Sequence, residues 1–270
     1  MKILLSTVVA MTLLLGSDHE PLVPMPAGYA MVLRNFVVDG GLVDYAGLKG
    51  SGEANAIAEE VSRVKASDYE SLAERDRIAF WLNAYNAFTL KLIVDHYPIQ
   101  PSTGKNKFPA NSIRQIPGAW EHKKFEALGR EVTLDEIEHK ILRIEFAEPR
   151  VHMALVCAAM SCPKLRREPY SGVQLDAQLD DQARVFLSDL TKFHIDREAN
   201  EVWASRIFEW FVDDFLPGAT KANPRHVAQQ KSLAAFASKY VSPEDARYLE
   251  AGDYTVKYFE YDWTLNEQPK

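Results

Sequence analysis

The chain is poor in cysteine and carries no excess of positive charge. Its 270 residues include only two cysteines, and 31 lysines and arginines stand against 38 aspartates and glutamates, for a formal net charge of -7. This balance gives no electrostatic reason to expect a nucleic acid or an anionic membrane as a partner. Beyond the N-terminal region, no apolar run approaches transmembrane length without charges, so we expect no stable membrane anchor in the mature protein.

The N-terminus has the pattern of a secretory signal peptide. Lys2 precedes an apolar run over Ile3–Leu15 that is too short to span a bilayer, and the small residues Gly16 and Ser17 follow it. We therefore expect residues 1–17 to be a signal peptide and residues 18–270 to form a single domain in the periplasm or outside the cell. A buried N-terminal helix is the alternative.

The composition, 47% hydrophobic and 26% charged, is that of a globular protein with a large core. Apolar periodicity predicts helices over Glu53–Lys65, Asp68–His96, Thr133–Arg143, Val173–Leu190, Ile207–Leu216, Pro224–Tyr240 and Pro243–Ala251. It predicts hairpins within Phe125–Leu134 and Lys192–Ala204, strands over Val151–Cys157 and Tyr254–Trp263, and a loop over Gly47–Gly52. This order favours a single-domain α+β fold, with central helices packed with a small, mainly antiparallel sheet and hairpins.

The segment VHMALVCAAMSCPKL holds both cysteines, Cys157 and Cys162, and one of the seven histidines, His152. In a regular strand His152 and Cys157 would lie on opposite faces. Pro163 disfavours helix at Cys162, so a turn there can bring Cys162 back toward His152, and geometry favours this pair. A thiol with an imidazole is the combination most able to perform nucleophilic chemistry near neutral pH.

Export would change the meaning of these two cysteines. In an oxidising compartment they are able to form a disulfide, and a bridge over so short a loop would be conformational or redox-active more than stabilising. Two ordinary buried cysteines are a further alternative. The spacing His152-x4-Cys157-x4-Cys162 does not match the close ligand pairs of structural zinc sites, so we expect neither a metal nor a cofactor.

Two further pairs of polar residues lie within predicted helices. Asn83 and Asn86 are three residues apart in an apolar helix, where they either tie the helix to loop backbone or orient a catalytic histidine or an oxyanion. Glu138 and His139 form the second pair, and His139 and Arg143, four apart, can share a face and an anionic partner. Structural ion pairs are the alternative to a catalytic role for them.

Several uncommon strings resemble, in order, the landmarks of the family known as domain of unknown function 547 (DUF547). They are LVDYAGLK, AFWLNAYNAFTL, LDEIEHKILR, PRVHMALVCAAMSCPKLRREPY, FEWFVDDF and YDWTLN, and they run from Leu42 to Asn266. The resemblance points to Asn83, Asn86, Glu138, His139, Arg150, His152, Cys157 and Ser161-Cys162-Pro163. Plant proteins similar to this chain have a serine where Cys162 stands, so the resemblance favours Cys157, whereas geometry favours Cys162.

Two functional hypotheses follow. The first is a thiol-dependent hydrolase or acyl transferase with Cys157 or Cys162 as nucleophile, His152 as base, and Asn83 or Asn86 orienting or stabilising. The second is a non-catalytic periplasmic binding or scaffold protein, in which the same residues form a satisfied polar core. In either case the expected partner is a small molecule or a peptide.

Overall fold

The computed structural model describes residues 27–102 and 107–269, so the expected signal peptide over residues 1–17 lies outside the described residues. The helices are α1 (Ala27–Phe36), α2 (Tyr45–Ser51), α3 (Glu53–Ser62), α4 (Ala66–Glu70), α5 (Glu74–His96), α6 (Leu134–Glu136), α7 (Leu175–Leu187), α8 (Arg206–Trp210), α9 (Val212–Phe215), α10 (Ala219–Ala222), α11 (Arg225–Ala237) and α12 (Pro243–Ala251). Short 3-10 helices span Ile113–Gln115 and Pro149–Met153, and a π-helix spans Ile137–Glu145. The strands are β1 (Phe125–Ala127), β2 (Arg130–Val132), β3 (Phe193–Asp196), β4 (Glu201–Ala204) and β5 (Thr255–Tyr258).

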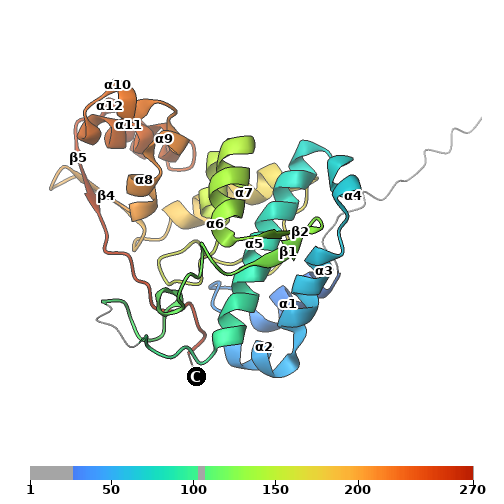
Figure 1. The fold of residues 1–270 in the computed structure, drawn as a ribbon. Helices are drawn as coiled ribbons and strands as arrows, with labels where there is room; N and C mark the ends of the chain where they lie inside the picture. The colour runs from blue at the N-terminus through green and yellow to red at the C-terminus, as the bar shows by residue number, and fades with distance from the viewer. Residues whose placement is uncertain (1–26, 103–106, 270) are drawn as a thin grey trace, which may run out of the picture.

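Helix α5 is the centre of the fold. It is apolar on nearly all sides, and its residues from Ile78 to Leu90 are all buried. Figure 1 shows α5 between α1–α3 on one side and α6 and α7 on the other. A helix that is hydrophobic around its whole circumference requires neighbours on every face, and this arrangement supplies them.

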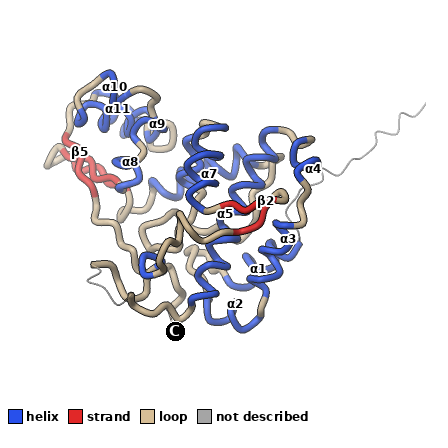
Figure 2. Tube along the Cα trace, in the orientation of Figure 1, coloured by secondary structure: helices blue, strands red, loops and turns tan. Residues whose placement is uncertain are grey.

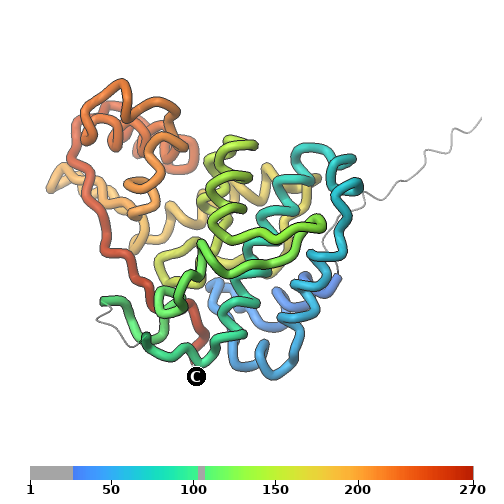
Figure 3. Tube along the Cα trace, viewed as in Figure 1, coloured from blue at the N-terminus to red at the C-terminus, as the bar shows by residue number. Residues whose placement is uncertain are grey.

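A second apolar cluster lies toward the C-terminus, on the far side of α7 from α1–α4 (Figure 1). This cluster contains residues of α8, α9, α11 and the strands β3 and β4. Met153 and Phe186 connect it to the segments around α5. The chain then returns across the molecule, as Figure 3 shows in red, and Val43 pairs with Glu267 in an isolated parallel bridge. The expected single-domain α+β fold is confirmed.

The strands are few and short compared with the helices and loops (Figure 2). Strands β1 and β2 form an antiparallel hairpin, and β3 and β4 form a second one to which β5 adds in parallel. The first hairpin turns through Leu128 and Gly129, both with positive φ (53° and 74°), as a tight two-residue hairpin turn requires. Both predicted hairpins are therefore confirmed.

The strand predicted over Val151–Cys157 is wrong. Pro149–Met153 forms a 3-10 helix, and the Glu148 side chain caps it by accepting the N–H of Arg150 at 3.0 Å. Proline suits the first helical position because its fixed φ is already helical. Residues 151–156 are all buried, so the apolar run reflects burial on every side, which periodicity alone does not distinguish from a buried strand.

The loop predicted over Gly47–Gly52 is also wrong, because α2 occupies most of it. The carboxylate of Asp44 accepts the N–H of Gly47 at 2.8 Å and caps this helix, and Gly52 ends it at φ 77°. The segment contains three glycines, but the cap outweighs the low helix propensity of Gly47 and Gly50, the two that lie inside α2.

Several boundaries differ from the predictions in a simpler way. The long helix predicted from Asp68 begins instead at Glu74, since α4 ends at Glu70 and the extended Ala73 precedes α5. The helix predicted over Ile207–Leu216 divides into α8 and α9 at Phe211, and only Thr255–Tyr258 of the last predicted strand is paired. Helix α1 was not predicted.

Candidate functional site

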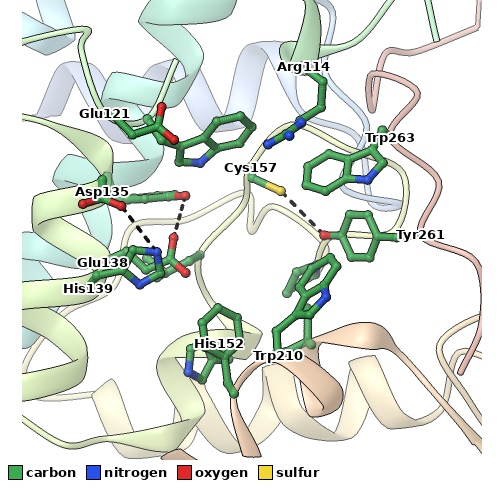
Figure 4. Close-up of a pocket in the computed structure, with 16 residues that line it drawn as sticks. Arg114, Glu121, Asp135, Glu138, His139, His152, Cys157, Trp210, Tyr261 and Trp263 are labelled. Atoms are coloured by element: carbon green, nitrogen blue, oxygen red, sulfur yellow. Dashed lines mark hydrogen bonds and ion pairs between the residues drawn. The ribbon is translucent and has the colours of Figure 1, made fainter. Parts of the chain in front are cut away.

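A cavity of about 220 Å³ is lined by residues that precede α7 in the chain and by residues that follow it. Its lining comes from several elements: Tyr85 of α5, the π-helix, the 3-10 helix over Pro149–Met153, α8 and the C-terminal segment. Figure 4 shows Glu138 and His139 on one side of it, Tyr261 and Trp263 on the other, and Cys157 between them. Segments far apart in the sequence therefore build one site.

The two cysteines form a disulfide, with their Cα atoms 6.3 Å apart. Cys157 lines the cavity and is partly exposed, whereas Cys162 is 3% exposed. The hydroxyl of Tyr261 donates a hydrogen bond to Cys162 Sγ at 3.3 Å and lies 3.6 Å from Cys157 Sγ. Burial raises the pKa of the Tyr261 hydroxyl far above its usual value, so this group stays a protonated donor.

His152 is buried and bonds to a carboxylate that the sequence analysis did not single out. Its Nε2 atom lies 2.7 Å from Asp214 Oδ2, and Arg143 Nη2 donates to Asp214 Oδ1 at 2.9 Å. The imidazole stacks on Phe211 with the ring centres 4.0 Å apart. Burial opposes ionisation of Asp214, but hydrogen bonds from His152 and Arg143 outweigh it and hold the pKa of this carboxyl well below its usual range.

The proposed thiol–imidazole pair is not formed in this oxidised structure. Within residues 27–102 and 107–269, neither sulfur has a hydrogen bond to His152 or His139, although both histidines line the cavity with Cys157. The observed hydrogen bond of His152 is instead the kind that orients an imidazole and fixes its tautomer.

Glu138 and His139 have separate partners at the cavity wall. Glu138 Oε2 accepts the hydroxyl of Tyr85 at 3.1 Å. Burial first, and then the neighbouring Glu138 carboxylate, raise the pKa of Tyr85. His139 Nδ1 lies 2.8 Å from Arg143 Nη1, and its Nε2 lies 3.7 Å from Asp135 Oδ1. Arg143 therefore connects the surroundings of His139 to the His152–Asp214 pair.

The two asparagines of α5 tie that helix to loop backbone, as the structural interpretation predicted. Asn83 donates to the carbonyl of Tyr170 at 2.8 Å and accepts its N–H at 2.9 Å. Asn86 donates to the carbonyl of Ala154 at 3.0 Å and accepts the N–H of Val156 at 3.0 Å. Both side chains are buried, and neither lines the cavity.

Aromatic rings from distant segments form a wall of the cavity. Tyr261 lies 4.6 Å from Trp263 and 4.9 Å from Trp210, measured between ring centres. The guanidinium of Arg114 lies 5.2 Å from the centre of the Trp263 ring and 5.4 Å from that of Trp120. A second hollow of about 910 Å³ shares Arg114, Trp210, Tyr261 and Trp263, so this wall continues to the surface.

Arg150, to which the resemblance also pointed, is not among the cavity-lining residues. It forms ion pairs with Glu148, Asp176 and Asp180, at 2.6–2.9 Å. The hydrogen bonds that Arg150 donates to Glu148 raise the pKa of Arg150, and burial opposes this with a smaller effect. Its observed role is to connect the 3-10 helix to α7.

No group of three or more His, Cys, Asp or Glu side chains in the described residues is placed to hold a metal ion. None of the helices within residues 27–102 and 107–269 has the length and apolarity needed to cross a bilayer.

Comparison with known proteins yields a family match and nothing closer. Residues 69–187 match the family described as "Protein of unknown function, DUF547". The matched region includes α5, Glu138, His139, His152 and both cysteines, and it confirms the resemblance drawn from the sequence. Asp214 and the C-terminal side of the cavity lie outside the match. No curated protein and no solved structure matches the chain.

Proposed function

We propose that this member of the DUF547 family is an exported binding protein that holds a small organic molecule or a peptide side chain in the cavity over the disulfide. The main support for this proposal is the cavity itself, in which an aromatic wall (Trp210, Tyr261, Trp263) lies opposite ionisable groups. Ligand sites combine apolar and aromatic surface with a few placed polar groups in this way.

The hydrogen bonds of the conspicuous polar residues support binding over catalysis. Asn83 and Asn86 are committed to loop backbone, His152 Nε2 to Asp214, and both sulfurs to one another. A nucleophile requires a free thiolate, and the disulfide of the oxidised protein supplies none. Ligand binding needs only the preformed cavity.

The lining also limits the kind of ligand. The faces of Trp210 and Trp263 suit a planar or apolar body, because aromatic surfaces stack on such groups. Carboxylates of Glu121, Asp135 and Glu138 on one side and Arg114 on the other suit a molecule with polar or charged ends. A purely aliphatic ligand would remove water from these groups and offer them no polar contact in return.

A fluorescent probe tests the binding role. 8-Anilinonaphthalene-1-sulfonate, with its aromatic body and one charged end, should bind the oxidised protein saturably at one site. Trp210→Ala should weaken this binding at least tenfold at little cost in stability, because Trp210 is 46% exposed. Trp203→Ala is the control, since Trp203 lies on β4 and does not line the cavity. Unsaturable binding, or equal loss in both variants, would contradict the proposal.

A second candidate is the thiol-dependent hydrolase or acyl transferase, acting after reduction of the bridge. The observation in its favour is that Cys157 lines the same cavity as His139 and His152. His152 bonded to Asp214 resembles the base and orienting carboxylate of a catalytic triad. Reduced protein should then hydrolyse p-nitrophenyl acetate faster than Cys157→Ser, and equal rates would rule this candidate out.

A further inference from the structure

The disulfide is not needed to hold the loop that it closes. The cysteines are only five residues apart, and so short a loop yields little stabilisation from chain entropy. Backbone hydrogen bonds already fix the loop to the C-terminal segment: Met160 N–H to Thr264 O at 2.8 Å, Ser161 N–H to Asp262 O at 3.1 Å and Asn266 N–H to Ala158 O at 3.1 Å. The bridge is therefore able to open without releasing the loop from the C-terminal segment, as a chemical role would require.

The two sulfurs differ in access. Cys157 lines the cavity and is partly exposed, so a molecule in the cavity can reach its sulfur. Cys162 also borders a hollow on another side, near Lys192, but it is only 3% exposed. An incoming nucleophile therefore meets Cys157 first.

The buried sulfur has two hydrogen-bond donors. The N–H of Cys157 lies 3.2 Å from Cys162 Sγ, and the hydroxyl of Tyr261 lies 3.3 Å from it. Both bonds would strengthen if negative charge developed on Cys162 Sγ, because hydrogen bonds to charged acceptors are about twice as strong as neutral ones. Cys162 is therefore the sulfur equipped to leave as a thiolate.

We propose that the Cys157–Cys162 bridge is the centre of a thiol–disulfide exchange with a dithiol that enters through the cavity. A thiolate of the dithiol attacks Cys157 Sγ, which forms a mixed disulfide and breaks the Cys157–Cys162 bond with the electron pair going to Cys162 Sγ. The second thiol of the dithiol loses its proton to solvent. Its sulfur then attacks the first sulfur of the dithiol, closing a disulfide within that molecule and releasing Cys157 as a thiolate. The dithiol is oxidised by two electrons and the protein is reduced by two. This activity goes beyond ligand binding and does not rest on it.

Trapping shows which sulfur is attacked. Oxidised protein is treated with glutathione, a monothiol, then quenched with acid and N-ethylmaleimide and mapped by mass spectrometry. We expect glutathione on Cys157 and maleimide on Cys162. Glutathione on Cys162, two free thiols in protein isolated without reductant, or a bridge that yields only after unfolding in urea would each overturn the proposal.

The rate of reduction tests the donor. With dithiothreitol under native conditions, Tyr261→Phe should be reduced roughly threefold to tenfold more slowly, because one hydrogen bond to the partly charged leaving sulfur is lost. Tyr258→Phe is the control, since the hydroxyl of Tyr258 has no hydrogen-bond partner among the described residues. The binding of anilinonaphthalenesulfonate by each variant separates loss of the donor from damage to the cavity. Equal rates for Tyr261→Phe and Tyr258→Phe would overturn the role of Tyr261.

Discussion

The Nε2 atom of His152 lies 2.7 Å from Oδ2 of Asp214, a residue 62 positions later in the chain. The pair joins the 3-10 helix to α9, and Arg143 brings the π-helix to the same carboxylate. Three elements thus converge on one ionised group, and two of them, the π-helix and the 3-10 helix over Pro149–Met153, also line the cavity.

Asp214→Asn should destabilise the protein at neutral pH. Loss of the charge weakens the bonds to His152 and Arg143, and we expect a cost of about 2 kcal/mol in the free energy of unfolding, as for other partly buried pairs. Denaturant unfolding at pH 7 measures it. Asp213→Asn is the control, because Asp213 is exposed and bonds to Thr220 instead. Equal losses in the two variants would contradict the role given to Asp214.

The same pair predicts how stability depends on acid. The folded-state pKa of Asp214 is lowered, so its stabilisation is present above the unfolded-state value, about 4, and is lost as the pH falls toward the folded-state value. The difference between wild type and Asp214→Asn should therefore be full at pH 6 and shrink below about pH 4. Thermal unfolding between pH 3 and pH 7 checks this, and a difference that grows in acid would be the wrong sign.

Asn83→Ala and Asn86→Ala should each lower the thermal midpoint. Each substitution strands a buried backbone N–H and a buried carbonyl, with a cost of about 1–3 kcal/mol. Asn55→Ala on the exposed side of α3 is the control and should change stability little. Variants of Asn83 or Asn86 with wild-type stability would show that the observed hydrogen bonds do not hold the helix to the loops.

Alkylation of the reduced protein separates the two candidate functions. If the protein only binds, iodoacetamide below pH 7 should modify Cys157 at the same rate in wild type and in His152→Gln, a variant that keeps a donor toward Asp214. If His152 activates the thiol, its imidazolium would stabilise the thiolate, and the variant should react at least tenfold more slowly. We expect equal rates, because neither sulfur has a hydrogen bond to His152 among the described residues.

Export remains a prediction from the N-terminal pattern and suits a bridged cysteine pair. The mature protein should begin near Asp18 and accumulate outside the cytoplasm. Mass spectrometry of protein purified from its native host measures the N-terminus directly. An intact Met1 on protein from the cytoplasm would show that the apolar run is not a signal peptide.

Features encoded by neighbouring residues could be predicted from the sequence. Thr133, Ser205 and Ser242 cap helices at or next to the first residues of three predicted helices, and both hairpins form where they were predicted. The buried amides of Asn83 and Asn86 could also be foreseen, since a polar group in an apolar helix requires a partner.

The surroundings of His152 could not be predicted in the same way. Residues 151–156 owe their apolarity to burial beneath α5 and α7, where Asn86 and Gln182 bind their backbone, so no local period reveals their conformation. Asp214 lies in FEWFVDDF, which the resemblance noted, but which of its two aspartates turns inward depends on the break between α8 and α9. Contacts over such separations are set by tertiary packing and leave no local pattern.

The dependence of the cysteine loop on the C-terminal segment has a consequence for biosynthesis. Tyr261, which donates to the sulfur of Cys162, follows that cysteine by 99 residues. At 5–20 residues per second, the ribosome adds Tyr261 roughly 5–20 s after Cys162. During that interval the nascent chain lacks Tyr261 and also Asp262, Thr264 and Asn266, whose backbone binds the cysteine loop. The loop that carries the two thiols can therefore take its observed position only after this segment has been synthesised.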